Sequence, residues 1–226
     1  MTTLALFDLD HTLLPLDSDY EWARYLVRRG AVDVADFEAR NGVFFTQYQA
    51  GTLDPVEYLD FALGTLAAIP RDVREALLAD YMREVITPAL LPQARALIRR
   101  HRDAGDLIAI VTATNRFVTA PIARALEIDH LLAAEPERDA AGELTGRLHG
   151  IPTSGEGKIT HTRAWLAGMD RTLDSFERSY FYSDSHNDLP LLSVVTDPVA
   201  TNPNSLLTAH AQARGWPILK LFHRND

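Results

Sequence analysis

Residues 4–12 read LALFDLDHT, an apolar run that leads into Asp8, Asp10 and Thr12. The apolar run is typical of a short β-strand buried on both faces of a sheet. The polar residues follow its carboxyl end, where open α/β sheets place their ligand sites. Carboxylates two positions apart on an extended chain point to opposite faces, so both reach one crevice only if the chain turns just after Asp8. An acidic turn without a function is the alternative for this segment taken alone.

Two carboxylates in one crevice would suit a hard cation. Mg²⁺ takes oxygen ligands and often binds one or two carboxylates together with a substrate phosphate. The segment therefore makes Mg²⁺ the candidate cofactor.

Composition narrows the class of protein. The chain has 226 residues, enough for one large domain or a domain with an insertion, and 46% of them are hydrophobic, which provides for a substantial core. A net charge of −9 with no basic cluster argues against a nucleic acid as partner. Cysteine is absent, which excludes disulfides and thiolate metal sites. We find neither an apolar run of about 18 residues nor a signal peptide, and expect no spanning membrane segment and a cytoplasmic location.

Apolar runs and helical patterns alternate along most of the chain. The expected strands are Leu4–Phe7, Leu107–Thr112, Arg178–Asp184, Val199–Thr201 and Ile218–Leu221. The expected helices between them are Pro92–Ala104, Asn115–Leu126, Lys158–Met169 and Asn204–Arg214. This alternation predicts an α/β fold, a doubly wound parallel sheet covered by helices on both faces.

Two segments depart from this pattern. Residues 15–88 show helical periodicity, as in Trp22, Tyr25 and Leu26, and no convincing strand. We expect them to form a separate helical unit, inserted between residues 1–14 and 89–226 of the core. Turn signals within Glu135–Pro152 predict a small β-hairpin.

Three further groups of polar residues stand at strand ends or helix starts. Thr112 to Asn115 place hydroxyls and free backbone N–H groups where a helix begins, a location that favours anions. Lys158 follows a Gly-rich turn and opens a helix, and Asp184 and Asp188 follow another strand. Each group alone also fits a capping or turn role, but their ordered occurrence points to one site.

In this order the motifs resemble those of the haloacid dehalogenase superfamily, in its phosphoserine-phosphatase-like branch (subfamily IB). The first motif of that family, Asp-x-Asp-x-Thr behind an apolar strand, is matched by residues 8–12. Its Ser or Thr is matched by Thr112, its Lys by Lys158, and its acidic pair by Asp184 and Asp188. The helical cap of this branch lies between the first two motifs, where residues 15–88 fall. The resemblance therefore covers nearly the whole chain and implies a Rossmann-like core with an inserted helical cap.

The resemblance implies a Mg²⁺-dependent phosphatase of small phosphorylated metabolites. In it Asp8 is the nucleophile that forms a phospho-aspartyl intermediate, and Asp10 is the general acid and base. Mg²⁺ is held by Asp8, by the carbonyl of Asp10 and by Asp184.

The remaining family positions hold the phosphate or support the site. Thr112, Lys158 and the backbone N–H groups near Leu9 and Ala113 are expected to bind the phosphoryl oxygens. The supporting residues would be Thr12, Asn187 and Asp188, which orient the lysine and the metal. His186 lies inside the last motif, and its part in the site is left open.

The sequence indicates the substrate less directly than it indicates the reaction. In phosphoserine phosphatases a carboxylate nine positions beyond the nucleophile receives the substrate amine. Asp17 occupies that position in this chain, and Asp19 is near it. For Asp17, capping of a helix is an equal alternative. Arg40 is a candidate for binding a substrate carboxylate, but residues 43–54 contain no Arg or Lys. An unpaired substrate carboxylate would be costly in a closed site. We therefore hypothesise a phosphorylated amino alcohol without a carboxylate, first of all histidinol phosphate. Trp22 and Phe44 are candidates to stack on its imidazole ring, with packing in the core as their alternative role.

Alternatives remain at this point. Phosphoserine and lipid phosphates are the other substrate candidates. A phosphate-ester sensor without catalysis, on the same fold, is the alternative of another class; it would bind such esters without hydrolysing them.

Overall fold

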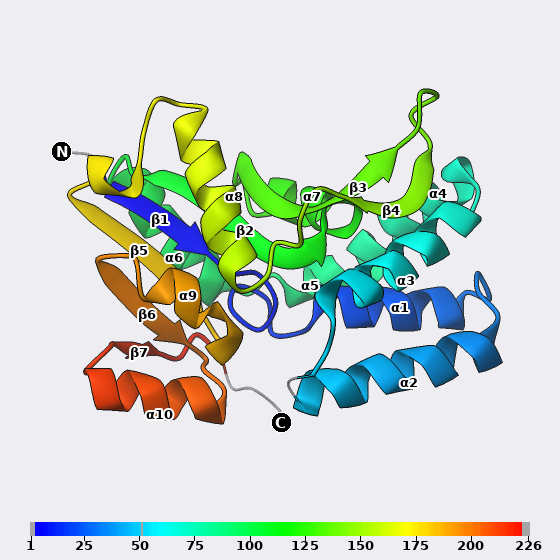
Figure 1. The fold of residues 1–226 in the computed structure, drawn as a ribbon, viewed down its shortest axis with the longest axis horizontal. Coiled ribbons are helices and arrows are strands. Elements are labelled where there is room, and N and C mark those ends of the chain that lie inside the picture. The colour runs from blue at the N-terminus through cyan, green and yellow to red at the C-terminus, as the bar shows by residue number, and fades with distance from the viewer. Residues whose placement is uncertain (1–2, 51, 223–226) are drawn as a thin grey trace.

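The computed structural model describes residues 3–50 and 52–222, and a seven-stranded sheet runs through its core (Figure 1). The order of the strands is β4-β3-β2-β1-β5-β6-β7. Neighbouring strands are parallel except β3 and β4, which pair antiparallel. The strands are β1 (Thr3–Phe7), β2 (Leu107–Asn115), β3 (His130–Arg138), β4 (Leu144–His149), β5 (Arg178–Ser183), β6 (Asp197–Thr201) and β7 (Ile218–Leu219).

Helices connect most of the strands. They are α1 (Ser18–Arg28), α2 (Val34–Ala50), α3 (Pro55–Ala68), α4 (Arg71–Tyr81), α5 (Thr87–Ala89), α6 (Pro92–Asp103), α7 (Arg116–Ala125), α8 (Glu156–Ala167), α9 (Leu189–Leu192) and α10 (Ser205–Arg214). A π-helical turn η1 (Met82–Ile86) links α4 to α5, and short 3₁₀ turns η2 (Leu173–Ser175) and η3 (His186–Asp188) flank β5. Within the described residues, no helix combines the length and apolar character needed to cross a bilayer.

Strand β1 shows why the sheet is covered on both sides. Ala5 and Phe7 belong to one hydrophobic cluster, which includes side chains of α6 and α7. Leu4 and Leu6 belong to a second cluster, built with α8, α9 and α10. Successive side chains of a strand point to opposite faces, so every residue of this run is buried. The predicted doubly wound α/β sheet is confirmed, with β4 as its antiparallel edge strand.

The order of the strands also fixes where a ligand site forms. From β1 the chain crosses to β2 on one side, and later elements place β5 on the other side. A crevice opens at the carboxyl end of a strand where the order reverses in this way. Asp8 directly follows β1, Thr112 lies in β2, and Asp184 directly follows β5.

Helices α1 to α4 lie together at one end of the molecule, away from β6, β7 and α10 (Figure 1). They contain the residues predicted to form a helical unit, and Trp22, Tyr25 and Leu26 are buried as their periodicity indicates. Burial of this apolar stripe, rather than intrinsic propensity, stabilises α1.

The hairpin predicted within Glu135–Pro152 is present as β3 and β4, and β3 begins earlier, at His130, because it also pairs parallel with β2. Helix α3 packs against β4 at small residues. A Cβ atom placed on Gly146 would lie 3.2 Å from the Cα of Gly64. The hairpin therefore supports the helical unit from the side of the core.

Several strand ends differ from the sequence-based expectation: β1 begins at Thr3, β5 ends at Ser183 and β6 begins at Asp197. Strand β2 continues past Thr112 to Asn115, with a shift in its register against β3 between Val111 and Asn115. Strand β7 stops at Leu219 because the next backbone N–H groups, of Leu221 and Phe222, donate to the side-chain oxygen of Asn202 instead.

Gly157 is the tightest glycine position near the crevice. A Cβ atom there would lie 2.0 Å from the carbonyl oxygen of Pro152, a distance that requires the backbone to move. We expect Gly157→Ala to lower the free energy of unfolding by about 2–3 kcal/mol, the cost of overpacking a rigid contact. Gly42→Ala is the matched control, because no described atom lies within 4 Å of its Cβ position; it should stabilise helix α2 by about 0.5–1 kcal/mol. Urea unfolding measures both, and equal midpoints would contradict the assigned contact.

Candidate active site

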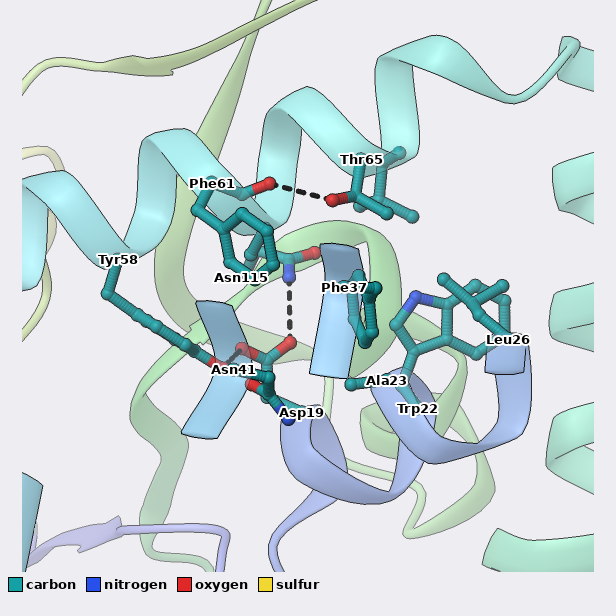
Figure 2. Close-up of a pocket in the computed structure, with 12 residues that line it drawn as sticks. Asp19, Trp22, Ala23, Leu26, Phe37, Asn41, Tyr58, Phe61, Thr65 and Asn115 are labelled. Atoms are coloured by element: carbon teal, nitrogen blue, oxygen red, sulfur yellow. Dashed lines mark hydrogen bonds between the residues drawn. The ribbon is translucent and has the colours of Figure 1, made fainter. Parts of the chain in front are cut away.

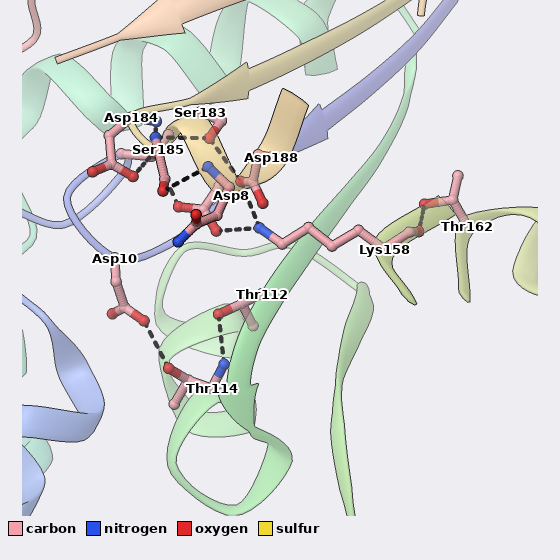
Figure 3. Close-up of polar contacts among 12 residues, drawn as sticks. Asp8, Asp10, Thr112, Thr114, Lys158, Thr162, Ser183, Asp184, Ser185 and Asp188 are labelled. Carbon is pink, nitrogen blue, oxygen red and sulfur yellow. Dashed lines mark hydrogen bonds and ion pairs between the residues drawn. The ribbon is translucent and has the colours of Figure 1, made fainter. Parts of the chain in front are cut away.

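Asp8, Lys158 and Asp188 form the buried centre of the crevice (Figure 3). The Lys158 Nζ donates to Asp8 Oδ1 and to Asp188 Oδ2, each at 2.7 Å. Asp8 follows β1, Lys158 lies in the first turn of α8, and Asp188 ends η3, so three distant segments meet at one cation. Their side chains are almost fully buried, which makes these charge-assisted bonds strong and their geometry well defined.

The turn predicted after Asp8 is present and brings Thr12 back beside it. The carbonyl oxygen of Leu9 accepts from the backbone N–H groups of Thr12, Leu13 and Leu14. The Thr12 Oγ1 lies 3.1 Å from Asp8 Oδ2 and 3.5 Å from Asp184 Oδ1, and it accepts the backbone N–H of Asp184. Thr12 thus joins the ends of β1 and β5.

Asp10 occupies a separate position on the side of the helical unit. Its Oδ1 accepts the backbone N–H of Ser18 at 2.7 Å, and its Oδ2 accepts from Thr114 Oγ1 at 2.8 Å. Burial raises the pKa of Asp10 well above its usual value, and the neighbouring charges of Asp17 and Asp8 add to this. A carboxyl group with a raised pKa holds a proton more readily and is suited to donate it to a leaving oxygen.

The predicted phosphate-binding residues lie on the neighbouring strand and turn. Thr112 is buried, and its Oγ1 accepts the backbone N–H of Thr114 at 3.2 Å, so its own proton remains for another acceptor. Ala113 is exposed, and Leu9 lies directly between the two carboxylates in the chain.

The environment of Lys158 favours the protonated, positively charged form of its amine. Burial lowers the pKa of its amine, but the charges of Asp188 and Asp8 outweigh this and hold the pKa above its usual value. Asp188 also accepts from Ser183 Oγ at 2.7 Å. Burial raises the pKa of Asp188, and the adjacent Lys158 partly offsets this.

Three buried carboxylates gather in the crevice. Asp8, Asp184 and Asp188 are all at least nine-tenths buried, and Lys158 forms ion pairs with Asp8 and Asp188. Asp8 and Asp184 both approach the Thr12 hydroxyl, so their oxygens converge. Such a set fits a divalent cation that prefers oxygen ligands. Among the described residues, no group of three or more His, Cys, Asp or Glu side chains is placed to hold a metal ion by itself. Mg²⁺ commonly binds one or two carboxylates and takes its other ligands from water and substrate phosphate.

Two residues of the last motif, His186 and Asn187, lie outside the buried centre formed by Asp8, Lys158 and Asp188. Asn187 is exposed, and its backbone N–H donates to Ser185 Oγ. No hydrogen bond joins Asn187 or His186 to Lys158 within the described residues. Ser183, which the sequence analysis missed, makes the contact to Asp188 instead.

The four candidates for substrate contacts differ in their placement. Asp17 is the N-cap of α1, since its Oδ1 accepts the backbone N–H groups of Asp19 and Tyr20. Asp19 and Trp22 line a pocket between the helices (Figure 2). Arg40 is exposed, and its guanidinium lies over the ring of Phe61 at 4.5 Å from the ring centre.

The partners of other supporting residues could not be assigned from the sequence. Asn202 donates from Nδ2 to the carbonyl oxygens of His11 and Thr12 and thereby fixes the loop behind the nucleophile. Thr114 holds Asp10, and Asn115 contacts Asp19. Single Thr and Asn residues are common, and only the fold shows which of them reach the crevice.

Comparison with known proteins agrees with this geometry. The model of the haloacid dehalogenase-like hydrolase family matches residues 5–193. A histidinol-phosphatase of Neisseria meningitidis is 41% identical over 97% of this chain and 99% of its own length. A phosphoserine phosphatase of Mycobacterium tuberculosis is 33% identical over 96% of this chain and 70% of its own.

Solved structures show the same fold. A protein of unknown function from Bordetella pertussis has a TM-score of 0.94 at 51% identity, covering 98% of this chain and 100% of that one. A substrate-bound phosphoserine phosphatase has a TM-score of 0.65 at 18% identity, covering 97% and 93%, and this likeness concerns the fold alone. From the family model, the curated relatives and the crevice together, the chain belongs to the haloacid dehalogenase-like hydrolase family and is a phosphatase of that family.

Proposed function

We propose that this phosphatase hydrolyses histidinol phosphate, with Asp8 as its nucleophile. The observation that carries the role of Asp8 is its position, where Lys158 and Thr12 hold one carboxylate oxygen each. The substrate is supported by the 41% identity with a histidinol-phosphatase over nearly the full length of both chains.

We also propose that Mg²⁺ binds at the oxygens of Asp8, Asp184 and the Asp10 carbonyl. The convergence of two carboxylates on the Thr12 hydroxyl supports this ligand set. A bound Mg²⁺ would offset the repulsion between the anionic nucleophile and the anionic phosphate.

The proposed reaction then proceeds by two successive displacements at phosphorus. A carboxylate oxygen of Asp8 attacks phosphorus, the ester P–O bond breaks, and Asp10 gives its proton to the departing alkoxide. A water molecule next attacks the phosphorus of the aspartyl phosphate and loses its proton to Asp10, which releases phosphate and restores both carboxyl groups. Lys158, Thr112 and the N–H groups of Leu9 and Ala113 would hold the phosphoryl oxygens during both steps.

Residues 15–88 are proposed to act as the cap over this site, with residues 1–14 and 89–226 as the catalytic core. Two hydrogen bonds support this division, since the Asp10 carboxyl accepts from the backbone N–H of Ser18 in the helical unit and from the Thr114 hydroxyl in the core. A cytoplasmic location stays a prediction of the sequence.

A panel of phosphate esters tests the proposal. With Mg²⁺ present, we expect kcat/KM for histidinol phosphate to exceed those for phosphoserine and phosphatidylglycerophosphate by at least about tenfold, equal to about 1.4 kcal/mol of transition-state binding. Chelation of the metal should abolish turnover, and added Mg²⁺ should restore it. Equal and poor turnover of all three esters would overturn the substrate. Binding without hydrolysis would identify a sensor instead.

A further inference from the structure

Asp19 is a buried carboxylate that the proposed reaction does not use. It lies in the first turn of α1 and is 6% exposed. Its Oδ2 accepts from the Tyr58 hydroxyl at 2.5 Å, and its Oδ1 accepts from Asn115 Nδ2 at 3.2 Å (Figure 2). Both partners are neutral, and no Lys, Arg or His of the described chain forms an ion pair with this carboxylate.

The pocket that Asp19 lines is otherwise mostly apolar. Trp22, Phe37 and Phe61 contribute aromatic rings, and the described residues that line the pocket include no basic side chain. Trp22 is 3% exposed, and its indole Nε1 is buried without a hydrogen-bond partner among the described residues. The pocket therefore offers one anionic acceptor, one unused N–H donor and aromatic walls.

The residues that hold Asp10 are chain neighbours of Asp19 and of its partner Asn115 in two separate segments. Ser18, whose N–H donates to Asp10, immediately precedes Asp19. Thr114, whose hydroxyl donates to Asp10, immediately precedes Asn115, the partner of Asp19. The two carboxyl groups, Asp10 and Asp19, are therefore held by the same two segments of the chain.

An isolated buried carboxylate is costly and is ordinarily paired with a cation. Burial raises the pKa of Asp19 to about 6, with the Tyr58 bond acting in the opposite direction and the Asp17 charge adding to the rise. Above that pH the group is largely ionised, so a bound cation would relieve the cost of its burial.

We propose that Asp19 receives the cationic nitrogen of the substrate's organic part, while Tyr58 and Asn115 hold the carboxylate and Trp22 Nε1 donates to a substrate acceptor. This rests on the proposed function and names the feature of the ester that the site selects. Asp17, the acid nine positions beyond Asp8, is engaged as the N-cap of α1 and does not take this role. A substrate carboxylate finds no basic partner in the pocket, so the preferred ester is a cationic one without it.

The first test compares esters that differ in their nitrogen. Histidinol phosphate carries an amine and a ring, 2-(imidazol-4-yl)ethyl phosphate carries the ring alone, and O-phosphoethanolamine carries the amine alone. We expect Asp19→Asn to reduce the preference for histidinol phosphate over the amine-free ester, measured as the ratio of kcat/KM values, by at least about tenfold. Asp60→Asn, an exposed carboxylate of α3, is the matched control and should keep the ratio. An unchanged ratio in Asp19→Asn would overturn the assignment, and activity on O-phosphoethanolamine that depends on Asp19 would identify the amine as the recognised group.

The second test does not depend on turnover. Calorimetric titration with histidinol, the organic part without phosphate, should show binding at least about tenfold weaker in Asp19→Asn than in the wild type or Asp60→Asn. The wild type could fail to hydrolyse histidinol phosphate and still bind histidinol more tightly than Asp19→Asn does. That result would support the cation site and reject the proposed substrate. Equal binding by all three proteins, or none by the wild type, would reject the cation site. Because the substitution removes an unpaired buried charge, Asp19→Asn should melt no lower than the wild type at pH 7.5, which shows that lost binding is not lost folding.

Discussion

Asp8→Asn should lower the turnover of histidinol phosphate by at least about 10³-fold, since an amide oxygen is a poor nucleophile toward phosphorus. The reason is local. The Asp8 carboxylate is held by Lys158 on one oxygen and by Thr12 on the other, and an ionised carboxylate attacks without a separate base. Asn has nearly the same shape, so the variant should keep the fold and its thermal transition.

Rapid acid quenching with a ³²P-labelled ester gives the direct measurement. The wild type should retain label on the protein during turnover, and Asp8→Asn should retain none. Asp174→Asn, an exposed carboxylate in η2, serves as the control and should behave as the wild type does. Label on the Asp8 variant, or turnover comparable with the wild type, would remove Asp8 from the reaction.

The central strand and the residues that follow it could be predicted because their signals are local. An apolar run ending in two carboxylates places Asp8 at a strand end by itself, and the other motif residues follow from the same rule. The convergence of Asp8, Lys158 and Asp188 depends in addition on β1 lying between β2 and β5. The resemblance to a known family supplied that order, which apolar patterning alone does not contain.

The long-range partners of several site residues were not predicted. Thr114 reaches Asp10 across 104 positions of the sequence, and Asn202 reaches Thr12 across 190. The register shift in β2 sits at this place and is invisible in the apolar run, which is why the strand was expected to end at Thr112. Hydroxyl and amide side chains carry no periodic pattern, so the fold alone selects which of them take part.

Asp19 shows a signal that helical geometry could have supplied. Residues three, four and seven positions apart lie on one face of a helix, and Asp19 shares that face with Trp22, Ala23 and Leu26. All four are buried. A carboxylate on the apolar face of an amphipathic helix requires an explanation, because burial of an unpaired charge is selected against unless it has a use. This argument favours Asp19 over Asp17 without any reference to the pocket.

Replacement of Lys158 should lower both the stability of the protein and its turnover, for two different reasons. Lys158→Met leaves Asp8 and Asp188 without the cation that lies 2.7 Å from each. Loss of one partner of a buried charge network costs about 3–5 kcal/mol of unfolding free energy, because the remaining charges are uncompensated. Turnover should also fall by at least about 10²-fold, since the phosphoryl oxygens lose a fixed positive charge. Urea unfolding and initial rates measure the two effects, and Lys220→Met, at the exposed second lysine of the chain, is the control.

A second substitution in the same network makes the assignment sharper. Asp188→Asn added to Lys158→Met removes one of the two buried carboxylates that the first substitution leaves without a cation. The double variant should therefore recover a large part of the lost stability. It should recover no turnover, because the charge that faces the phosphate is still missing. Strictly additive losses of stability would mean that Lys158 and Asp188 do not act as a pair. Turnover that returned together with stability would show that the lysine only supports the fold, and the crevice would then need another group to hold the phosphate.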